Sequence, residues 1–383
     1  MPRSIAILPI LALLLAFAPA APVPKVSKDA MYYFPTQVGT KLVYWVELTK
    51  TEVTELVEDA EVKDGEVIVT IRRSPETSAL LKQEKLSVSA KGIMRLEESG
   101  QPVRPPVWLL KLPHEPGAKW DDDARNKSTY TVGAVEEVEV PAGKFKAIPV
   151  TRHWSMLNTP VQTTDWYAPG VGLVKRVLRG GDREVTQLVL KSVTTAEEME
   201  QAVLKLCAVF ADKRLSEAVR EDAIRKLIRI GPASRWAIPN LVELLEDPKT
   251  STYLLYAAVD ALTYMGPRAA PAVPTLLRLL ERSAALWRDQ YRAVAAHQAV
   301  GATALWLDGW DRWRKEFEQH GLPFDIWVSW TVLADQRGIL RALQAIGPAA
   351  APAVEALTRY REKVQGHPIL EKQAHDALTA IDK

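Results

Sequence analysis

The sequence predicts an α+β multidomain protein, in which an antiparallel β half-barrel or sandwich is followed by an all-α solenoid. Three observations lead to this fold class. Short β-branched and aromatic runs alternate with turn residues over 32–193. A helix-capping motif follows at 194–198, and one phrase is repeated three times over 220–381. The 383 residues, 47% of them hydrophobic, are enough for two separate cores.

The first residues have the pattern of a targeting signal. Arg3 supplies a positive charge, residues 5–17 are apolar, and Ala18-Pro19-Ala20 is a small-x-small cleavage site. The alternative is an uncleaved membrane anchor, but the run is shorter than the roughly 20 residues that a span needs. We therefore expect a signal peptide at 1–20, a flexible lead-in at 21–31, and export to the periplasm or beyond the cell. No stable membrane span is expected after cleavage.

The region 32–193 has the punctuation of an antiparallel sheet, because its turns are too short for helical crossovers. In one turn, Pro141 presets the first position and Gly143 supplies the left-handed conformation that closes a bulged hairpin. In another, Pro169 followed by Gly170 fits a type II turn. The predicted strands include residues 43–46, 67–71, 144–150, 172–178 and 185–193.

The order of motifs in this region also carries a resemblance. Tyr33-Phe34-Pro35 precedes Val38-Gly39, Trp120 follows Gly117, and Val140-Pro141-Ala142-Gly143 precedes Trp166-Tyr167-Ala168-Pro169-Gly170. This series resembles a family of exported bacterial proteins of undefined activity, whose domain is similar to the curved half-barrels of periplasmic lipoprotein-carrier type. The resemblance covers about 32–193. It implies a fold and leaves the ligand open.

A helical region is expected to begin at Thr195, which forms a capping box with Glu198. No flexible spacer precedes it, so we assign 194–383 as one helical domain. Three helical runs then end in a Gly-Pro pair followed by Ala, an aliphatic residue and Leu at fixed offsets, which resembles the HEAT-type repeat. The residues expected to shape these repeats are Gly231, Pro232, Pro239, Gly266, Pro267, Pro274, Gly347 and Pro348.

The spacing between the second and third copies is much longer than that between the first two, so a divergent insertion is expected at about 283–336. It is rich in tryptophan at helical spacing. Such a stripe predicts either a core that packs the insertion against the repeats or an exposed face for a partner or ligand. The tryptophans concerned are Trp306, Trp310, Trp313, Trp327 and Trp330.

Other candidate sites have simpler interpretations. The balance of 49 basic and 47 acidic side chains argues against nucleic acid as a partner. Asp121-Asp122-Asp123 lacks the alternating spacing of a calcium loop, so a solvated turn is expected. The six histidines lack metal-ligand spacing, and Cys207, the only cysteine, lies in an apolar run that predicts burial. No nucleophile elbow or phosphate loop occurs, so no catalytic residue, metal or cofactor is assigned.

These observations predict an exported, non-enzymatic scaffolding module that binds a protein partner through its helical repeats. The alternative is a periplasmic carrier or sensor that holds a lipid or other apolar ligand in the β domain. A third hypothesis follows from the repeat type alone: an enzyme related to the HEAT-like proteins that attach pigments to carrier proteins.

Overall fold

The computed structural model describes residues 32–75, 82–122, 128–156, 159–181, 183–284, 326–365 and 368–383. The chain forms two compact units. The first, called the barrel unit, contains residues 42–55 and 73–193 together with the described residues up to 35; the second, called the helical unit, contains residues 36–41, 56–72 and 194–383. The expected signal peptide and lead-in, at 1–20 and 21–31, lie outside the described residues.

Thirteen strands within the described ranges form one antiparallel sheet. Its neighbours follow the order β6-β5-β4-β3-β2-β1-β13-β12-β11-β10-β8-β7, and β9 pairs with β10. The strands are β1 (Lys41–Val46), β2 (Thr51–Lys63), β3 (Glu66–Pro75), β4 (Lys82–Ser89), β5 (Gly92–Glu98), β6 (Gln101–Lys111), β7 (Lys119–Asp122), β8 (Ser128–Val132), β9 (Glu136–Val140), β10 (Gly143–Met156), β11 (Thr159–Ala168), β12 (Gly172–Gly180) and β13 (Arg183–Thr194).

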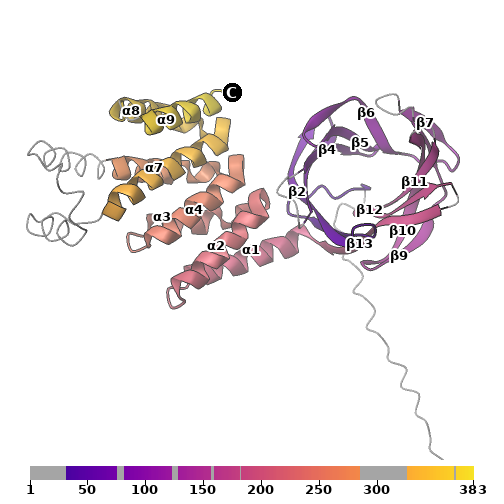
Figure 1. Cartoon of the computed structure of the whole chain (residues 1–383), viewed down its shortest axis with the longest axis horizontal. Coiled ribbons are helices and arrows are strands. Elements are labelled where there is room, and N and C mark those ends of the chain that lie inside the picture. Colours follow the sequence, from indigo (N-terminus) through magenta and orange to yellow (C-terminus); the bar gives the residue numbers. More distant parts are fainter. Residues whose placement is uncertain are drawn as a thin grey trace, which may run out of the picture. The chain divides into compact units, whose positions relative to one another are not determined.

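The sheet curls into a nearly closed barrel, because its two terminal strands meet (Figure 1). Trp120 on β7 donates its indole N–H to the Trp108 carbonyl on β6 at 3.2 Å. The Lys111 ammonium lies 5.5 Å from the Trp120 ring. The expectation of a half-barrel or sandwich is therefore corrected. Side chains join β6 to β7, because the prolines of β6 lack N–H donors and so limit backbone pairing between these two strands.

Glycine conformations place the turns of the barrel. Gly170, between β11 and β12, has φ +69°, as the third position of a type II turn requires. Gly143, which follows the Pro141-Ala142 turn and opens β10, has φ +133°. Gly92 also has a positive φ, and a Cβ built on it would lie 2.0 Å from the Leu110 carbonyl oxygen. Glycine is therefore required where β5 starts against β6.

The helical unit repeats one order of elements, in which an α-helix is followed by a short 3₁₀ helix and then by a second α-helix. The helices are α1 (Ala196–Ala211), α2 (Glu217–Ile230), η1 (Gly231–Ala237), α3 (Ile238–Glu246), α4 (Thr252–Met265), η2 (Gly266–Ala272), α7 (Ile326–Ile346), η4 (Gly347–Ala353), α8 (Val354–Lys363) and α9 (Pro368–Ile381). Residues 273–284 are also helical. In α1, Thr195 and Glu198 form the expected capping box.

Each repeated Gly-Pro pair opens a short 3₁₀ helix between two α-helices, where the sequence suggested a simple break. Gly231, Gly266 and Gly347 have φ values of +69°, +58° and +61°, so each needs the freedom of glycine. The third copy has Glu355 where the other two have proline, yet α8 begins at the equivalent position, Val354. The common backbone path therefore depends on the glycine.

The core of the helical unit is apolar and continuous, as the periodicity of the helices requires. The row α2, α4, α7 and α9 packs in sequence, with the 3₁₀ segments and α3 and α8 beside it (Figure 1). Cys207 is buried in this core, as predicted, and burial raises the pKa of its thiol to about 11. Trp327 and Trp330 belong to α7, although their side chains lie outside the described residues, as do Trp306, Trp310 and Trp313.

Residues 56–72 of β2 and β3 group with the helical unit because their side chains contact residues of its helices. Leu56 is buried together with Met199 and Ala233. Arg72 donates from Nη2 to the Ile230 carbonyl at 2.7 Å, at the end of α2, while Glu58 holds its Nε at 3.0 Å. An arginine at a helix C-terminus stabilises the exposed carbonyls there.

Candidate binding site in the barrel

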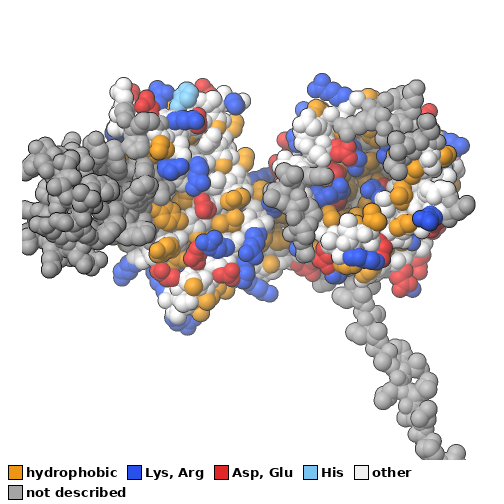
Figure 2. Space-filling model, viewed as in Figure 1, with side chains coloured by type: hydrophobic (Ala, Val, Ile, Leu, Met, Phe, Trp, Pro, Cys, Tyr) orange, Lys and Arg blue, Asp and Glu red, His pale blue; other side chains and the backbone are white. Residues whose placement is uncertain are grey.

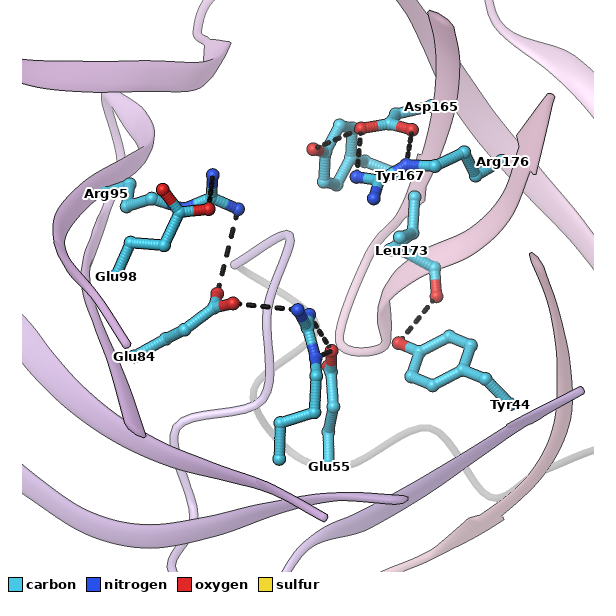
Figure 3. Close-up of polar contacts among 10 residues, drawn as sticks. Tyr44, Glu55, Glu84, Arg95, Glu98, Asp165, Tyr167, Leu173 and Arg176 are labelled. Atoms are coloured by element: carbon cyan, nitrogen blue, oxygen red, sulfur yellow. Dashed lines mark hydrogen bonds and ion pairs between the residues drawn. The ribbon is translucent and has the colours of Figure 1, made fainter. Parts of the chain in front are cut away.

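Charged side chains from several strands meet inside the barrel. Figure 3 shows Glu84 and Arg95 on one side pointing toward Asp165 and Arg176 on the other. Their strands are far apart in the sheet order, since β4 and β5 lie near one end and β11 and β12 near the other. The curling of the sheet therefore creates this group of charges, which we call the charged cluster.

Arg73 on β3 joins the first half of the charged cluster. Its Nε lies 2.9 Å from Glu55 on β2, and its Nη2 also donates to Glu55. Its Nη1 lies 2.8 Å from Glu84 on β4. Glu55 is the main cause that raises the pKa of Arg73 above its ordinary value, so the guanidinium stays charged. One arginine thus connects three strands.

Arg95 on β5 extends this network. Its Nη2 lies 3.6 Å from Glu84, and its Nη1 donates to Glu98 at 3.3 Å. The Arg95 Nε is buried and has no hydrogen-bond partner within the described ranges. A buried donor without a partner costs roughly 1–3 kcal/mol. This donor therefore favours a state in which something else accepts its hydrogen bond.

Arg176 on β12 makes a bidentate pair with Asp165 on β11, at 2.6 and 2.7 Å. Burial opposes the charge of Arg176, but Asp165 outweighs burial, so the pKa of Arg176 lies above its ordinary value. The Tyr167 hydroxyl also donates to Asp165, at 3.3 Å. Burial, and then the Asp165 charge, raise the pKa of Tyr167, which keeps its hydroxyl protonated. Arg176 therefore stays charged, and Tyr167 stays protonated.

The two halves act on the same tyrosines. Tyr44 on β1 donates its hydroxyl to the Leu173 carbonyl at 2.9 Å. Burial raises its pKa, and charges from both halves, Glu55 and Arg176 among them, also act on it. The pKa of Tyr167 likewise responds to both Asp165 and Arg95. Charges from both halves of the cluster therefore act on these two buried tyrosines.

The exposed fractions of the side chains show which members of the charged cluster reach open space in the barrel interior. The side chains of Arg73 and Arg176 are 33% and 30% exposed, although desolvation acts on the pKa of both. The carboxylates of Glu55 and Glu84 are only 8% exposed, and that of Asp165 is 15% exposed. The arginine side chains thus reach open space in the interior more than the carboxylates that they bind.

The interior next to the charged cluster is apolar and closed. On β3, Val69 and Ile71 share a face with Arg73, and on β4, Leu86 and Val88 share a face with Glu84. All four apolar side chains are at most 3% exposed. Arg73 and Glu84 lie near the β3–β4 connection, so the first half of the charged cluster is close to that end of the strands.

An aromatic and cationic row lies beside the charged cluster. Trp120, Tyr130 and Arg152 are direct partners across β7, β8 and β10. The Trp120 and Tyr130 rings stack at 5.4 Å. The Arg152 guanidinium lies 5.9 Å from Tyr130 and 5.5 Å from Trp154, and its Nε donates to Ser128 at 2.9 Å. Arg152 has no carboxylate partner among the residues that the structure describes.

None of the charged cluster was singled out from the sequence. The predicted turn residues lie in turns or at strand ends, the repeat residues lie at the ends of helices, and none of them belongs to this cluster. The acidic triplet does not form a solvated turn as expected: Asp121 and Asp122 belong to β7, and Asp122 is buried. Asp121 accepts a hydrogen bond from Thr129 across the ladder at 2.7 Å, and Asp123 lies outside the described residues.

A hollow lies on the helical unit, between the end of α8 and α9. It has a volume of about 520 Å³. Its mixed charge matches the visible face of the unit, where basic, acidic and hydrophobic side chains are interspersed (Figure 2). Such a surface is typical of solvated helices. The lining residues are Arg361, Glu362, Gln365, Glu371, Lys372 and His375.

In the part of the chain that the structure describes, no three His, Cys, Asp or Glu residues are grouped so that they could hold a metal ion. Among the described helices, none combines the length and the apolar character that crossing a membrane requires.

Comparison with known proteins gives distant matches only. No protein-family profile matches the chain, and no curated protein does. One similar solved structure is a protein classed as exported, with a YMCC-like fold, from Bacteroides fragilis NCTC 9343; it is 16% identical, has a TM-score of 0.29, and covers 43% of this chain and 99% of its own. Another, classed as a lipoprotein, comes from Parabacteroides distasonis ATCC 8503, with 14% identity, a TM-score of 0.30, and 43% and 98% coverage. Likeness at this level leaves the function of the chain open.

Proposed function

We propose that this chain is an exported, non-enzymatic binding protein whose barrel holds a small polar ligand in the open, charged part of its interior. The observation that carries the proposal is the charged cluster. Arginines from three strands lie partly exposed in the interior of a barrel whose neighbouring positions on β3 and β4 are filled by apolar side chains. Export rests on the signal pattern at 1–20.

The physical reason is the cost of this arrangement. Charges removed from water destabilise a protein unless they are paired, and a well-packed apolar interior of the same volume is often at least as stable. Fold stability alone does not require Arg73, Arg95 and Arg176 to converge. Rigid elements that hold polar groups at the edge of an apolar core are typical of small-molecule sites.

The site favours a polar group over a purely apolar ligand. The apolar interior positions of β3 and β4 are filled by their own side chains, which leaves an acyl chain little room there. The alternative predicted from the sequence is a lipid or other apolar ligand. Such a ligand would have to place a polar headgroup at the charged cluster and keep its tail outside the filled positions of β3 and β4.

Native mass spectrometry of the full chain, isolated gently from its own envelope fraction, tests the proposal. We expect a small nonprotein adduct that is released when the protein is denatured. The proposal would be overturned if the chain carries no adduct and its melting temperature is also unchanged by benzoate, benzylammonium, benzyl alcohol and inorganic phosphate.

A second candidate is the scaffolding function predicted from the repeats. The observation in its favour is on α4, where Tyr253 and Tyr264 are 69% and 58% exposed. Their spacing of three helical turns places them on one face. A photo-crosslinking residue at either position should capture the same protein partner in the native envelope, whereas one at Lys372 on α9 should not. Capture at all three positions, or at none, would count against this candidate.

A further inference from the structure

We infer that the ligand of the barrel carries an anionic group, such as a carboxylate or phosphate, that the open faces of Arg176 and Arg152 recognise. This inference rests on the proposed function and specifies its ligand class. The donor and acceptor groups of the charged cluster lead to it.

The carboxylates of the charged cluster are already engaged. Asp165 accepts from both Arg176 and Tyr167 and is 15% exposed. Glu84 accepts from Arg73 and faces Arg95, and Glu55 accepts from Arg73. A cationic ligand would have to displace these arginines before it could reach a buried carboxylate. The cluster therefore offers little to a cation.

The guanidinium groups keep donors available. Arg176 uses Nε and Nη2 on Asp165, so its Nη1 group has no partner among the described residues. Arg152 donates from Nε to Ser128, and neither of its Nη groups has a partner among the described residues. The buried Arg95 Nε also lacks a described partner. Only a ligand that accepts hydrogen bonds satisfies such donors, and charged acceptors do so most strongly.

The sheet register places Arg152 and Arg176 on the same face of the sheet, with β11 between their strands and a shift of two residues along it. Arg152 on β10 is opposite Thr163 on β11, and Asp165, two residues further on the same face, is opposite Arg176 on β12. Asp165 holds Arg176 by one edge of its guanidinium and leaves the other edge open. Tyr130 and Trp154 hold the Arg152 plane from the side. Both arginines are thus oriented before a ligand arrives, which lowers the entropy lost on binding.

Three probes with the same ring and different headgroups test the inference: benzoate, benzylammonium and benzyl alcohol, titrated into the full chain at constant ionic strength. Inorganic phosphate, without a ring, is the fourth probe. We expect benzoate or phosphate to shift the side-chain NMR signals of Arg176 and Arg152, and benzylammonium and benzyl alcohol to leave them unchanged.

Arg152→Gln is the main variant, because it leaves no carboxylate unpaired and so should fold. It should weaken binding of the anionic probe by about tenfold or more. Arg179→Gln is the matched control, since Arg179 is exposed on β12 opposite Gln162, on the other face of the sheet; it should bind like the unaltered chain. Arg176→Lys keeps the charge but loses the planar set of N–H donors of the guanidinium. It should weaken binding with little change in fold.

The outcomes separate the two proposals. Binding of benzylammonium or benzyl alcohol as tightly as benzoate would overturn the anionic inference and leave the binding function standing. Equal weakening by Arg152→Gln and Arg179→Gln would overturn it as well, because it would show a general charge effect. A chain that binds none of the four probes and carries no adduct would overturn both.

Discussion

The barrel unit and the helical unit place their charges differently. In the helices of the helical unit, pairs such as Arg225–Glu221 and Arg359–Glu355 join residues one turn apart on helix surfaces, and the core between the helices is apolar. In the barrel unit, Arg73, Arg95 and Arg176 join residues on different strands in the interior. The first pattern is what solubility and packing require. The second exceeds those requirements, which is why we place the function in the barrel.

The comparison predicts that the helical unit is most sensitive to loss of apolar volume. Leu227→Ala, at a fully buried position of α2, should lower the free energy of unfolding by roughly 2–5 kcal/mol because it leaves a cavity. Leu204→Ala, at a 39% exposed position of α1, is the control and should cost less than about 1 kcal/mol. Urea unfolding followed by circular dichroism at the helical band measures both. Equal losses would show that this core is not packed as described.

The barrel should be most sensitive to an unpaired interior charge. Glu55→Gln keeps the shape of the side chain and removes the main partner of Arg73, so we expect a loss of roughly 2–4 kcal/mol, somewhat below the full cost because Glu84 remains. Glu97→Gln is the control, since Glu97 pairs with the 40% exposed Lys85 between the same two strands as Glu84 and Arg95. It should cost about 0–1 kcal/mol. Urea unfolding followed by tryptophan fluorescence measures both, and equal losses would remove the distinction between the two units.

The repeats of the helical unit should each depend on one glycine. Gly266→Ala forces a side chain into a left-handed conformation, which costs of order 1–3 kcal/mol. Gly338→Ala, within α7, meets only Val259 at an ordinary 3.5 Å and should be neutral or stabilising by up to about 1 kcal/mol. Thermal unfolding of the two variants compares them. A neutral Gly266→Ala would mean that the 3₁₀ segment tolerates another backbone path.

The smallest effect concerns the start of the helical unit. Thr195→Ala removes the side chain that caps α1 at Glu198 and should cost about 1 kcal/mol. Ser216 precedes α2 but makes no capping hydrogen bond, so Ser216→Ala should cost a few tenths of that amount. Hydrogen exchange of the first-turn amides of α1 and α2 distinguishes the two caps. Similar changes at both would show that the capping box contributes little.

The sequence was most informative where structure depends on neighbours along the chain. The capping box at Thr195, the turn at Pro169-Gly170 and the recurring glycines at 231, 266 and 347 are local features, so residue types and spacing predict them. The burial of Cys207 followed from the apolar residues around it. Strand β2 was missed because its many acidic residues, among them Glu55 and Glu58, hide the alternation that marks a half-buried strand.

Only the tertiary structure decided which charges lie inside. Glu55, Arg73 and Glu84 look like ordinary polar residues of surface strands, and Asp165 and Arg176 lie far from them in the chain. They meet because the thirteen-stranded sheet curls until Trp120 on β7, at one end of the strand order, reaches Trp108 on β6, at the other end. A period of two residues states that a side chain is on one face of a strand, but not whether that face is the inside of a barrel. Closure of the sheet settles that choice, and it depends on pairings between strands that the local sequence does not encode.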